Sequence, residues 1–248
     1  MNRESKLTGK VAIITGAGRG IGRAIALSYA RAGAAVGCAA RTIAEINQLT
    51  NQIREEDGEA LAVKTDVTQL SSVRQCFEQV VAAFGGLDIV VINAGVNLDR
   101  NTIEDSDPEN WESTIAVNLI GAYYCIKAAI PYLKKRGNGK IITIGSGLGH
   151  KGSPSSSAYA CSKAGLWMLT RVLAMELRQS NISVNELIPG PVHTTIDQNY
   201  ENKTSFIPQL EQEWLKEPEE VIPLALFLAT QPDIGPTAQS FSLMRRDQ

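Results

Sequence analysis

The chain has 248 residues, of which 44% are hydrophobic and 20% charged, and its formal net charge is -2. These proportions are typical of a globular protein with a large core, and a pI near 5.8 provides no basic field for nucleic acid or an anionic membrane. No apolar run reaches the roughly 20 residues that span a bilayer, and no signal-peptide pattern opens the chain, so we expect a cytoplasmic protein.

The first predicted strand, residues 11–15, runs into a glycine-rich loop and an Ala-rich helix over residues 23–32. A strand, a glycine loop and a helix N-terminus form a phosphate cradle, because bare backbone approaches the anion and the helix end offers unpaired N–H groups. The loop departs from the G-x-G-x-x-G dinucleotide fingerprint, since Ile21 stands where the third glycine is required. A plain tight turn is the alternative, but this context favours nucleotide binding. The expected cradle residues are Gly16, Arg19, Gly20, Ile21 and Gly22.

The second predicted strand ends in Ala40 and Arg41. Sites that prefer NAD place a carboxylate about 20 residues beyond the glycines to bind the ribose hydroxyls, and no acid stands here. A guanidinium binds phosphate through two hydrogen bonds, so Arg41 and Arg19 favour the 2′-phosphate of NADP over the alternative of a plain surface arginine. Thr42 and Glu45 have the spacing of a capping box that opens the next helix.

Two further strands are predicted at residues 61–63 and 87–92. In the second of these the apolar residues are continuous rather than alternating, as expected when helices cover both faces of a parallel sheet. Asp66 and Val67 are placed to hold an adenine edge, although Asp66 could equally cap the helix predicted over residues 71–84. The strand at 87–92 closes with small residues, where a cofactor ring and ribose need close approach. These are Asn93, Ala94 and Gly95.

A long helix is predicted over residues 108–135, followed by a fifth strand at 140–145. Pro131 falls inside the helical pattern and should kink or end the helix, because proline lacks the N–H donor. Asn118 is the odd polar residue in this helix, and its position alone indicates only a tolerated polar site.

A Gly/Ser/Pro loop leads from Ser146 into a helix predicted over residues 158–178. Tyr159 and Lys163 are four residues apart and therefore share one face of that helix. A phenol is a poor acid at neutral pH, but a neighbouring ammonium favours the phenolate, so Tyr159 is a candidate proton donor and acceptor. Ser146 is placed to hydrogen-bond a substrate oxygen. The pair alone is weak, because this spacing also occurs by chance on solvated helix faces.

The sixth strand is predicted at residues 182–188, and Pro189 turns the chain out of the sheet. The polar segment of about residues 192–216 is predicted to form a substrate lid over the strand ends, where open α/β sheets bind ligands. A last helix to about residue 230 precedes a final strand at 239–243.

This alternation of strands and helices predicts an α/β fold. We expect a single doubly wound, Rossmann-type domain over residues 1–248, with a mostly parallel seven-stranded sheet and helices on both faces. His150, His193 and four scattered cysteines form no ligand cluster, so no metal is expected.

The motifs occur in the order in which the short-chain dehydrogenase/reductase family has them, and the chain resembles that family from Gly9 to about Leu243. Ser146 stands 13 residues before Tyr159 (159 − 146), which is the family's usual spacing. The catalytic residues implied by the resemblance are Asn118, Ser146, Tyr159 and Lys163. The implied contacts of the nicotinamide are Pro189, Gly190, Val192 and Thr194.

The resemblance implies that hydride passes from C4 of a nicotinamide to a carbonyl carbon while Tyr159 protonates the oxygen. Ser146 would hold that oxygen, Lys163 would lower the pKa of Tyr159 and bind the ribose, and Asn118 would support a water that relays protons. The end of the second strand is similar to NADP-preferring carbonyl reductases. We therefore expect NADPH-dependent reduction of a ketone or 3-oxoacyl group to a secondary alcohol, as in 3-oxoacyl-carrier-protein reductases.

Two alternatives stay open: an NAD-linked alcohol, sugar or steroid dehydrogenase on the same scaffold, and a non-catalytic cofactor-sensing protein. His150 and Lys151 are candidate substrate contacts, and the substrate is a small molecule or an acyl thioester. The family also implies a homo-oligomer, either a dimer or a tetramer. The sequence departs from the family pattern at Ile92, where asparagine is usual, and in the tail after Leu243.

Overall fold

The structure, a computed structural model, describes residues 6–194, 196 and 213–244 and places seven strands in one sheet. The strand order is β3-β2-β1-β4-β5-β6-β7, and every ladder between the described strands is parallel, which confirms the predicted doubly wound fold. The central strands are buried along their whole length and mainly apolar because helices cover both faces. The strands are β1 Val11–Thr15, β2 Ala35–Ala40, β3 Ala60–Lys64, β4 Ile89–Ile92, β5 Gly139–Ile144, β6 Ile182–Ile188 and β7 Ser240–Ser242.

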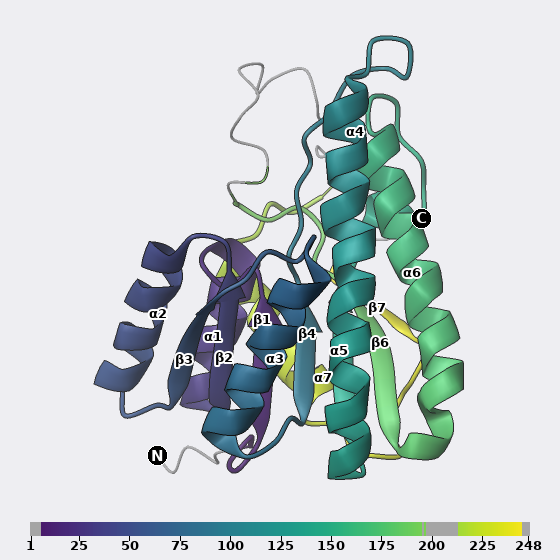
Figure 1. Ribbon diagram of the computed structural model, residues 1–248. Helices are drawn as coiled ribbons and strands as arrows, with labels where there is room; N and C mark the ends of the chain where they lie inside the picture. The colour runs from purple at the N-terminus through teal and green to yellow at the C-terminus, as the bar shows by residue number, and fades with distance from the viewer. Residues whose placement is uncertain (1–5, 195, 197–212, 245–248) are drawn as a thin grey trace.

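Helices pack on both faces of the sheet and enclose two apolar cores (Figure 1). One core holds Ile25 and Leu49 from α1 and α2, with α7 beside them. The other holds Phe77 and Leu133 from α3 and α5, with α6 beside them. The helices are α1 Gly20–Arg31, α2 Ile43–Glu55, α3 Leu70–Phe84, α4 Pro108–Ile115, α5 Gly121–Arg136, α6 Ser157–Leu177 and α7 Ile222–Ala229.

The winding of the sheet reverses beside β1. Ile13 of β1 pairs with Gly37 of β2 on one side and with Val90 of β4 on the other. The connections that follow β1 and β4 therefore leave toward opposite faces, and a crevice opens between them at the carboxyl ends of the strands. This crevice is where the predicted site residues gather.

The helix predicted over residues 108–135 is a rod with an irregular middle. A π-helical turn, Ala116–Ile120, separates α4 from α5, and the fully buried Asn118 lies in it. Of the two effects predicted for Pro131, an end of the helix is not found, because α5 continues to Arg136, and a kink stays a prediction. Pro131 lies on the exposed face of α5, so water can hydrate the backbone carbonyl that its missing N–H leaves without a donor.

This rod, Pro108–Arg136, is long and apolar enough to cross a membrane by length and composition alone. Its apolar residues include Cys125, Ile126 and Leu133, which are buried against the sheet in the core beneath α5. A core helix of this kind passes the same test of length and composition. The composition of the rod therefore does not place the chain in a membrane.

Two predicted helix caps differ from the structure. Thr42 occupies the N-cap position of α2, but its side chain makes no capping hydrogen bond, and the carboxylate of Glu45 lies beside Arg19 instead. The predicted capping box is therefore wrong. Asp66 does not cap α3, whose N-cap is Gln69.

Most of the predicted lid, residues 197–212 of the segment 192–216, lies outside the described residues. At its two ends, Val192 and Lys216 form an isolated parallel bridge. The N–H of His193 donates to the carbonyl of Lys216 at 2.8 Å. The segment therefore leaves and re-enters the described structure at one place, which borders the crevice.

Candidate active site

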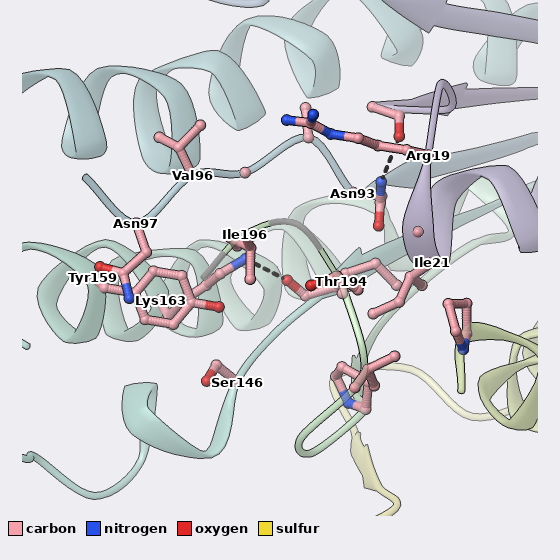
Figure 2. A pocket seen from close by; sticks show the side chains of 18 of the residues that line it. Arg19, Ile21, Asn93, Val96, Asn97, Ser146, Tyr159, Lys163, Thr194 and Ile196 are labelled. Atoms are coloured by element: carbon pink, nitrogen blue, oxygen red, sulfur yellow. Dashed lines mark hydrogen bonds between the residues drawn. The ribbon is translucent and has the colours of Figure 1, made fainter. Parts of the chain in front are cut away.

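A cleft with a volume of about 1370 Å³ opens at the carboxyl ends of the central strands (Figure 2). It brings together the predicted site residues except Gly22 and Asn118, which are buried behind its wall. The predicted residues that line it are Gly16, Arg19, Gly20, Ile21, Arg41, Asp66, Val67, Asn93, Ala94, Gly95, Ser146, Tyr159, Lys163, Pro189, Gly190, Val192 and Thr194.

The glycine loop is tied to the end of β4. Gly16 has a φ of 65°, in the left-handed region, and a Cβ there would stand only 2.9 Å from the Cα of Ala94. The side chain of Asn93 donates to the carbonyls of Thr15 at 2.9 Å and Gly16 at 3.2 Å, and the Thr15 hydroxyl accepts from the Asn93 N–H at 3.0 Å. Thr15 was not predicted as a site residue, because in the sequence it is indistinguishable from the other β-branched residues of the strand Val11–Thr15.

The start of α1 is open to an anion. Its N-cap residue, Arg19, makes no side-chain cap, and the first turn holds no acidic residue, so backbone N–H groups remain available at this end. Gly20 and Ile21 present this backbone to the cleft. Gly22 instead lets α1 approach β4, since a Cβ there would overlap the side chain of Asn93. These features fit the diphosphate of a dinucleotide.

Two arginines and two acids line the cleft near the ends of β2 and β3. Arg19 and Arg41 both face it, and Arg19 Nη1 lies 4.0 Å from Glu45 Oε1. This ion pair is substantially exposed and contributes little to stability. The Asp66 carboxylate accepts hydrogen bonds from the Thr68 N–H at 2.9 Å and its hydroxyl at 2.8 Å. A phosphate bound between the arginines would compete with Glu45 for Arg19.

Ser146, Tyr159 and Lys163 converge on the other part of the cleft, as Figure 2 shows. The Ser146 hydroxyl, at the end of β5, accepts from the Leu148 N–H at 3.2 Å. The Lys163 ammonium donates to the Ile144 carbonyl at 2.8 Å and stands 5.6 Å from the centre of the Tyr159 ring. A strand end and one helix face thus place a hydroxyl, a phenol and an amine around one space.

Burial sets the protonation of the phenol and the amine. Burial raises the pKa of Tyr159, while a hydrogen bond with Ser146 and the positive charge of Arg100 oppose this rise. Burial lowers the pKa of Lys163 to about 8, and the negative charge of Glu186 opposes that change. Tyr159 is therefore protonated at neutral pH and equipped to donate a proton. The predicted lowering of its pKa by Lys163 stays a prediction.

Asn118 is fully buried and acts on the backbone of the cleft wall. Its Nδ2 donates to the Val96 carbonyl at 2.8 Å and to Ser162 Oγ at 3.0 Å, while its Oδ1 accepts from the Val96 N–H at 2.8 Å. The Ser162 hydroxyl donates to the Tyr159 carbonyl at 2.7 Å. Asn118 thus joins the loop after β4 to the first turn of α6, and its predicted role in proton relay stays a prediction.

Arg100 lines the cleft and was not among the predicted site residues. With its amide oxygen turned toward Arg100, the buried Asn97 accepts from Nε at 3.2 Å and from Nη2 at 3.1 Å. Of the two candidate substrate contacts, Lys151 lines the cleft, whereas His150 does not and lies with its Nε2 2.9 Å from Glu186 Oε2. The sequence offered one indication of Arg100 as a site residue, which is its position shortly after the Asn-Ala-Gly turn.

We expect Lys163→Met to raise the free energy of unfolding by roughly 2 kcal/mol at pH 7 while abolishing turnover. Below pH 8 the folded protein must keep an ammonium in a buried site, and one pKa unit corresponds to about 1.4 kcal/mol. The unfolded lysine holds its proton up to about pH 10.5, so the wild-type protein gains stability as pH rises from about 8 to 10.5. The difference in free energy of unfolding between Lys163→Met and the wild-type protein should therefore shrink as pH rises over that range, which urea unfolding measures.

The matched control is Lys64→Met, because Lys64 is exposed at the end of β3. Its effect on unfolding should not change between pH 7 and pH 10. The idea that a buried Lys163 ammonium destabilises the fold is contradicted if Lys163→Met is no more stable than wild type at pH 7 and the difference does not change with pH.

The sequence matches the short chain dehydrogenase family over residues 10–205. It is 33% identical over 227 residues to a 3-oxoacyl-acyl-carrier-protein reductase of Thermotoga maritima, covering 91% of this chain and 92% of the relative. It is 40% identical over 191 residues to a D-beta-hydroxybutyrate dehydrogenase of Rhizobium meliloti, covering 75% and 73%. Among solved structures, a carveol dehydrogenase of Mycobacterium avium in complex with NAD matches with a TM-score of 0.88 at 26% identity, over 96% of this chain and 97% of that one.

Proposed function

We propose that this chain, which belongs to the short-chain dehydrogenase/reductase family, takes hydride from NADPH to reduce a ketone or 3-oxoacyl carbonyl to a secondary alcohol. Hydride exchange between a nicotinamide cofactor and a carbonyl or alcohol is the chemistry that the family and its relatives support. The observation that carries the proposal is the convergence of Ser146, Tyr159 and Lys163 beside a glycine cradle in one cleft.

The preference for NADPH is supported by the charges near the end of β2. Arg41 and Arg19 line the cleft there, and β2 ends in Ala40 without the carboxylate that would bind ribose hydroxyls. Glu45 is the acid of this region, and it stands beside Arg19. An NAD preference would need Glu45 to bind the ribose hydroxyls in place of a carboxylate at the end of β2.

The chain's own residues would handle the proton and the charge. The Tyr159 hydroxyl would give its proton to the carbonyl oxygen, which Ser146 Oγ would hold in place. The buried Lys163 ammonium would stabilise the charge that develops on the phenolate. Bound NADPH would supply the hydride to the carbonyl carbon. The cleft residues otherwise orient the reacting groups and exclude water.

An acyl thioester is favoured over a small neutral ketone by two cationic side chains of the cleft lining. Arg100 and Lys151 both line the cleft and would attract the phosphate groups of a thioester carrier. Glu213 also lines the cleft and offsets part of this positive charge. The similarity to a 3-oxoacyl reductase over most of the chain supports the same substrate class.

A homo-oligomer in the cytoplasm forms part of this proposal. The outer face of α6 exposes the apolar residues Met168, Val172 and Met175, which a second copy of the chain could cover. Light scattering should then give a mass of two or four chains of 26.7 kDa.

The proposal is tested by following oxidation of NADPH and of NADH over a panel holding an acetoacetyl thioester, an aryl ketone, a diketone and a keto sugar. We expect turnover with NADPH on the thioester at a kcat/KM at least about tenfold above that with NADH. Turnover with NADH alone contradicts the cofactor assignment, and turnover on ketones but not on the thioester contradicts the substrate class. No turnover with either cofactor contradicts the reductase itself.

A further inference from the structure

Glu186 is a buried acid next to the active site that the proposed reaction does not use. It lies on β6 with only 1% of its side chain exposed. Its Oε2 accepts from Ser240 Oγ of β7 at 2.5 Å and lies 2.9 Å from His150 Nε2, while its Oε1 has no hydrogen-bond partner among the described residues. Burying a carboxylate costs several kcal/mol unless nearby donors and cations compensate. Its surroundings therefore indicate what the carboxylate does.

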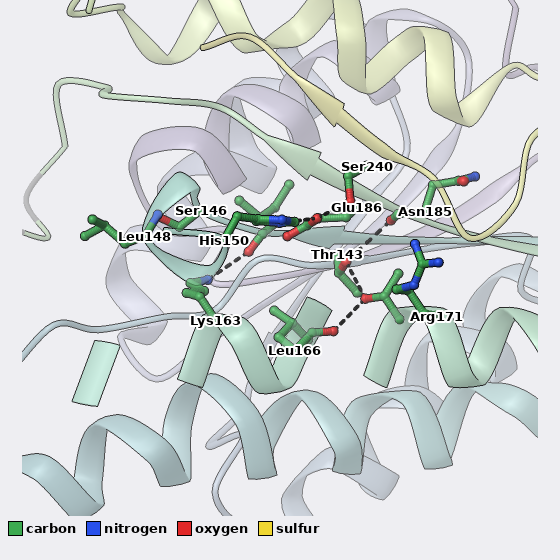
Figure 3. A network of polar contacts seen from close by, with 12 residues as sticks. Thr143, Ser146, Leu148, His150, Lys163, Leu166, Arg171, Asn185, Glu186 and Ser240 are labelled. Atoms are coloured by element: carbon green, nitrogen blue, oxygen red, sulfur yellow. Dashed lines mark hydrogen bonds and ion pairs between the residues drawn. The ribbon is translucent and has the colours of Figure 1, made fainter. Parts of the chain in front are cut away.

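The Glu186 carboxylate packs against both ends of the loop that carries Ser146. At the first end, a Cβ added to Gly145 would overlap the carboxylate, so only glycine fits between β5 and this acid. At the other end, the His150 ring lies on Trp167 of α6, with ring centres 4.9 Å apart, while its Nε2 contacts Glu186. The turn between Gly145 and His150 is thus held by one side chain (Figure 3).

The same carboxylate lies near the Lys163 ammonium. Lys163 Nζ donates to the Ile144 carbonyl at 2.8 Å, and the next residue, Gly145, packs directly against the Glu186 carboxylate. Figure 3 shows the Lys163 amine on the α6 side of the space that Glu186 reaches from β6. The negative charge of Glu186 raises the pKa of Lys163 against the lowering by burial. The other titratable or charged groups around the pair are His150 on the loop, Tyr159 on the cleft side of Lys163, and Arg171 farther along α6, which donates to a backbone carbonyl at 3.4 Å.

We propose that Glu186 is a positioning residue for this reaction: it fixes the Ser146 loop through His150 and places a buried negative charge near the Lys163 ammonium. The kinetic part of this inference rests on the proposed function. The effect on Lys163 does not, because the titration of a lysine can be measured without substrate or cofactor.

The first experiment follows the 13C resonance of the Lys163 Cε in lysine-labelled protein as a function of pH, with the signal assigned by its loss in Lys163→Met. Glu186→Gln keeps the shape of the side chain and removes its charge. We expect the Lys163 midpoint to fall by about one pH unit, a tenfold change in the protonation equilibrium. If Glu186→Gln does not fold, Glu186→Thr carries the same expectation on a β-branched residue suited to a strand.

The matched control is Ser240→Ala, which removes a donor to the same carboxylate and leaves its charge in place. It should keep the Lys163 midpoint within about 0.3 pH units, roughly a twofold change in equilibrium. A midpoint that is unchanged in Glu186→Gln overturns the electrostatic part of the inference, whatever the activity of the wild-type enzyme.

The second experiment compares kcat at pH 6.5 and pH 8.5. Glu186→Gln should lose at least about threefold more kcat at pH 8.5 than at pH 6.5, because a lower lysine midpoint removes the ammonium first at high pH. His150→Phe keeps a ring on Trp167 and removes the contact with Glu186. It should raise KM severalfold with the Lys163 midpoint unchanged. A loss of kcat in Glu186→Gln that is the same at both pH values overturns the proposed effect on Lys163. An unchanged KM in His150→Phe overturns the proposed fixing of the Ser146 loop.

Discussion

Tyr159→Phe is expected to lower kcat/KM for carbonyl reduction by about 1,000-fold, the range in which general acid catalysis contributes. The substitution removes only the hydroxyl oxygen, and the ring stays packed beside Lys163. Because the hydroxyl belongs to the cleft and not to the apolar cores, the fold should be unchanged. Steady-state kinetics with NADPH, together with a fluorescence titration of NADPH binding, measures both properties. The dissociation constant should stay within about twofold, since the substitution leaves the glycine cradle and the two arginines near β2 unchanged.

The control for this prediction is Tyr123→Phe, since Tyr123 is an exposed tyrosine on α5 that does not line the cleft. It should retain wild-type kinetics. Near-normal turnover in Tyr159→Phe would falsify the assignment of the proton donor. The proton donor would then have to be another residue of the cleft, and Arg100 would be the first to test.

Arg41→Asp is expected to change the ratio of kcat/KM with NADPH to that with NADH by about 1,000-fold in favour of NADH. A charge-assisted hydrogen bond contributes about 1.5–3 kcal/mol, and the introduced carboxylate would repel a 2′-phosphate and accept from ribose hydroxyls. These effects together reach about 4 kcal/mol, and each 1.4 kcal/mol is a factor of ten. Arg41 lies at the cleft rim beyond β2, so the change should leave the Ser146 and Tyr159 side of the site intact.

Glu45→Gln is the companion variant, because it removes the acid that contacts Arg19 without adding charge. It should raise kcat/KM with NADPH severalfold and leave kcat/KM with NADH within about twofold. An unchanged cofactor ratio in Arg41→Asp supports the alternative that Arg41 is a plain surface arginine. The opposite result in Glu45→Gln, a loss with NADH alone, indicates that Glu45 binds the ribose hydroxyls.

The strands and most helices follow from local pattern. Strands β1 and β2 begin and end where their apolar runs do, and strand β6 spans the predicted residues, because these segments are buried on both faces. The predicted cleft residues that follow strands, such as Asn93 and Ser146, were predictable for a related reason. They stand at the carboxyl ends of strands, and parallel strands bring these ends to one edge of the sheet.

What could not be predicted depends on contacts between distant segments. Nothing near Glu186 in sequence shows that its carboxylate meets His150 and Ser240, which lie 36 and 54 residues away. Glu45 has good capping-box spacing, but the neighbouring Arg19 belongs to another loop and draws its carboxylate away. Pro131 is tolerated because of which face of α5 it occupies, and the packing of the whole helix decides that face.

The π-helical turn, Ala116–Ile120, changes the direction in which side chains point around the axis of the long helix. A π turn holds one residue more than an α-helical turn, so the side chains before and after it are offset by about 100° around the axis. The face that α4 turns toward α6 is therefore set separately from the face that α5 turns toward α3. The loop and helix above the cleft can change in sequence and direction over evolution while the packing of α5 on the sheet stays as it is.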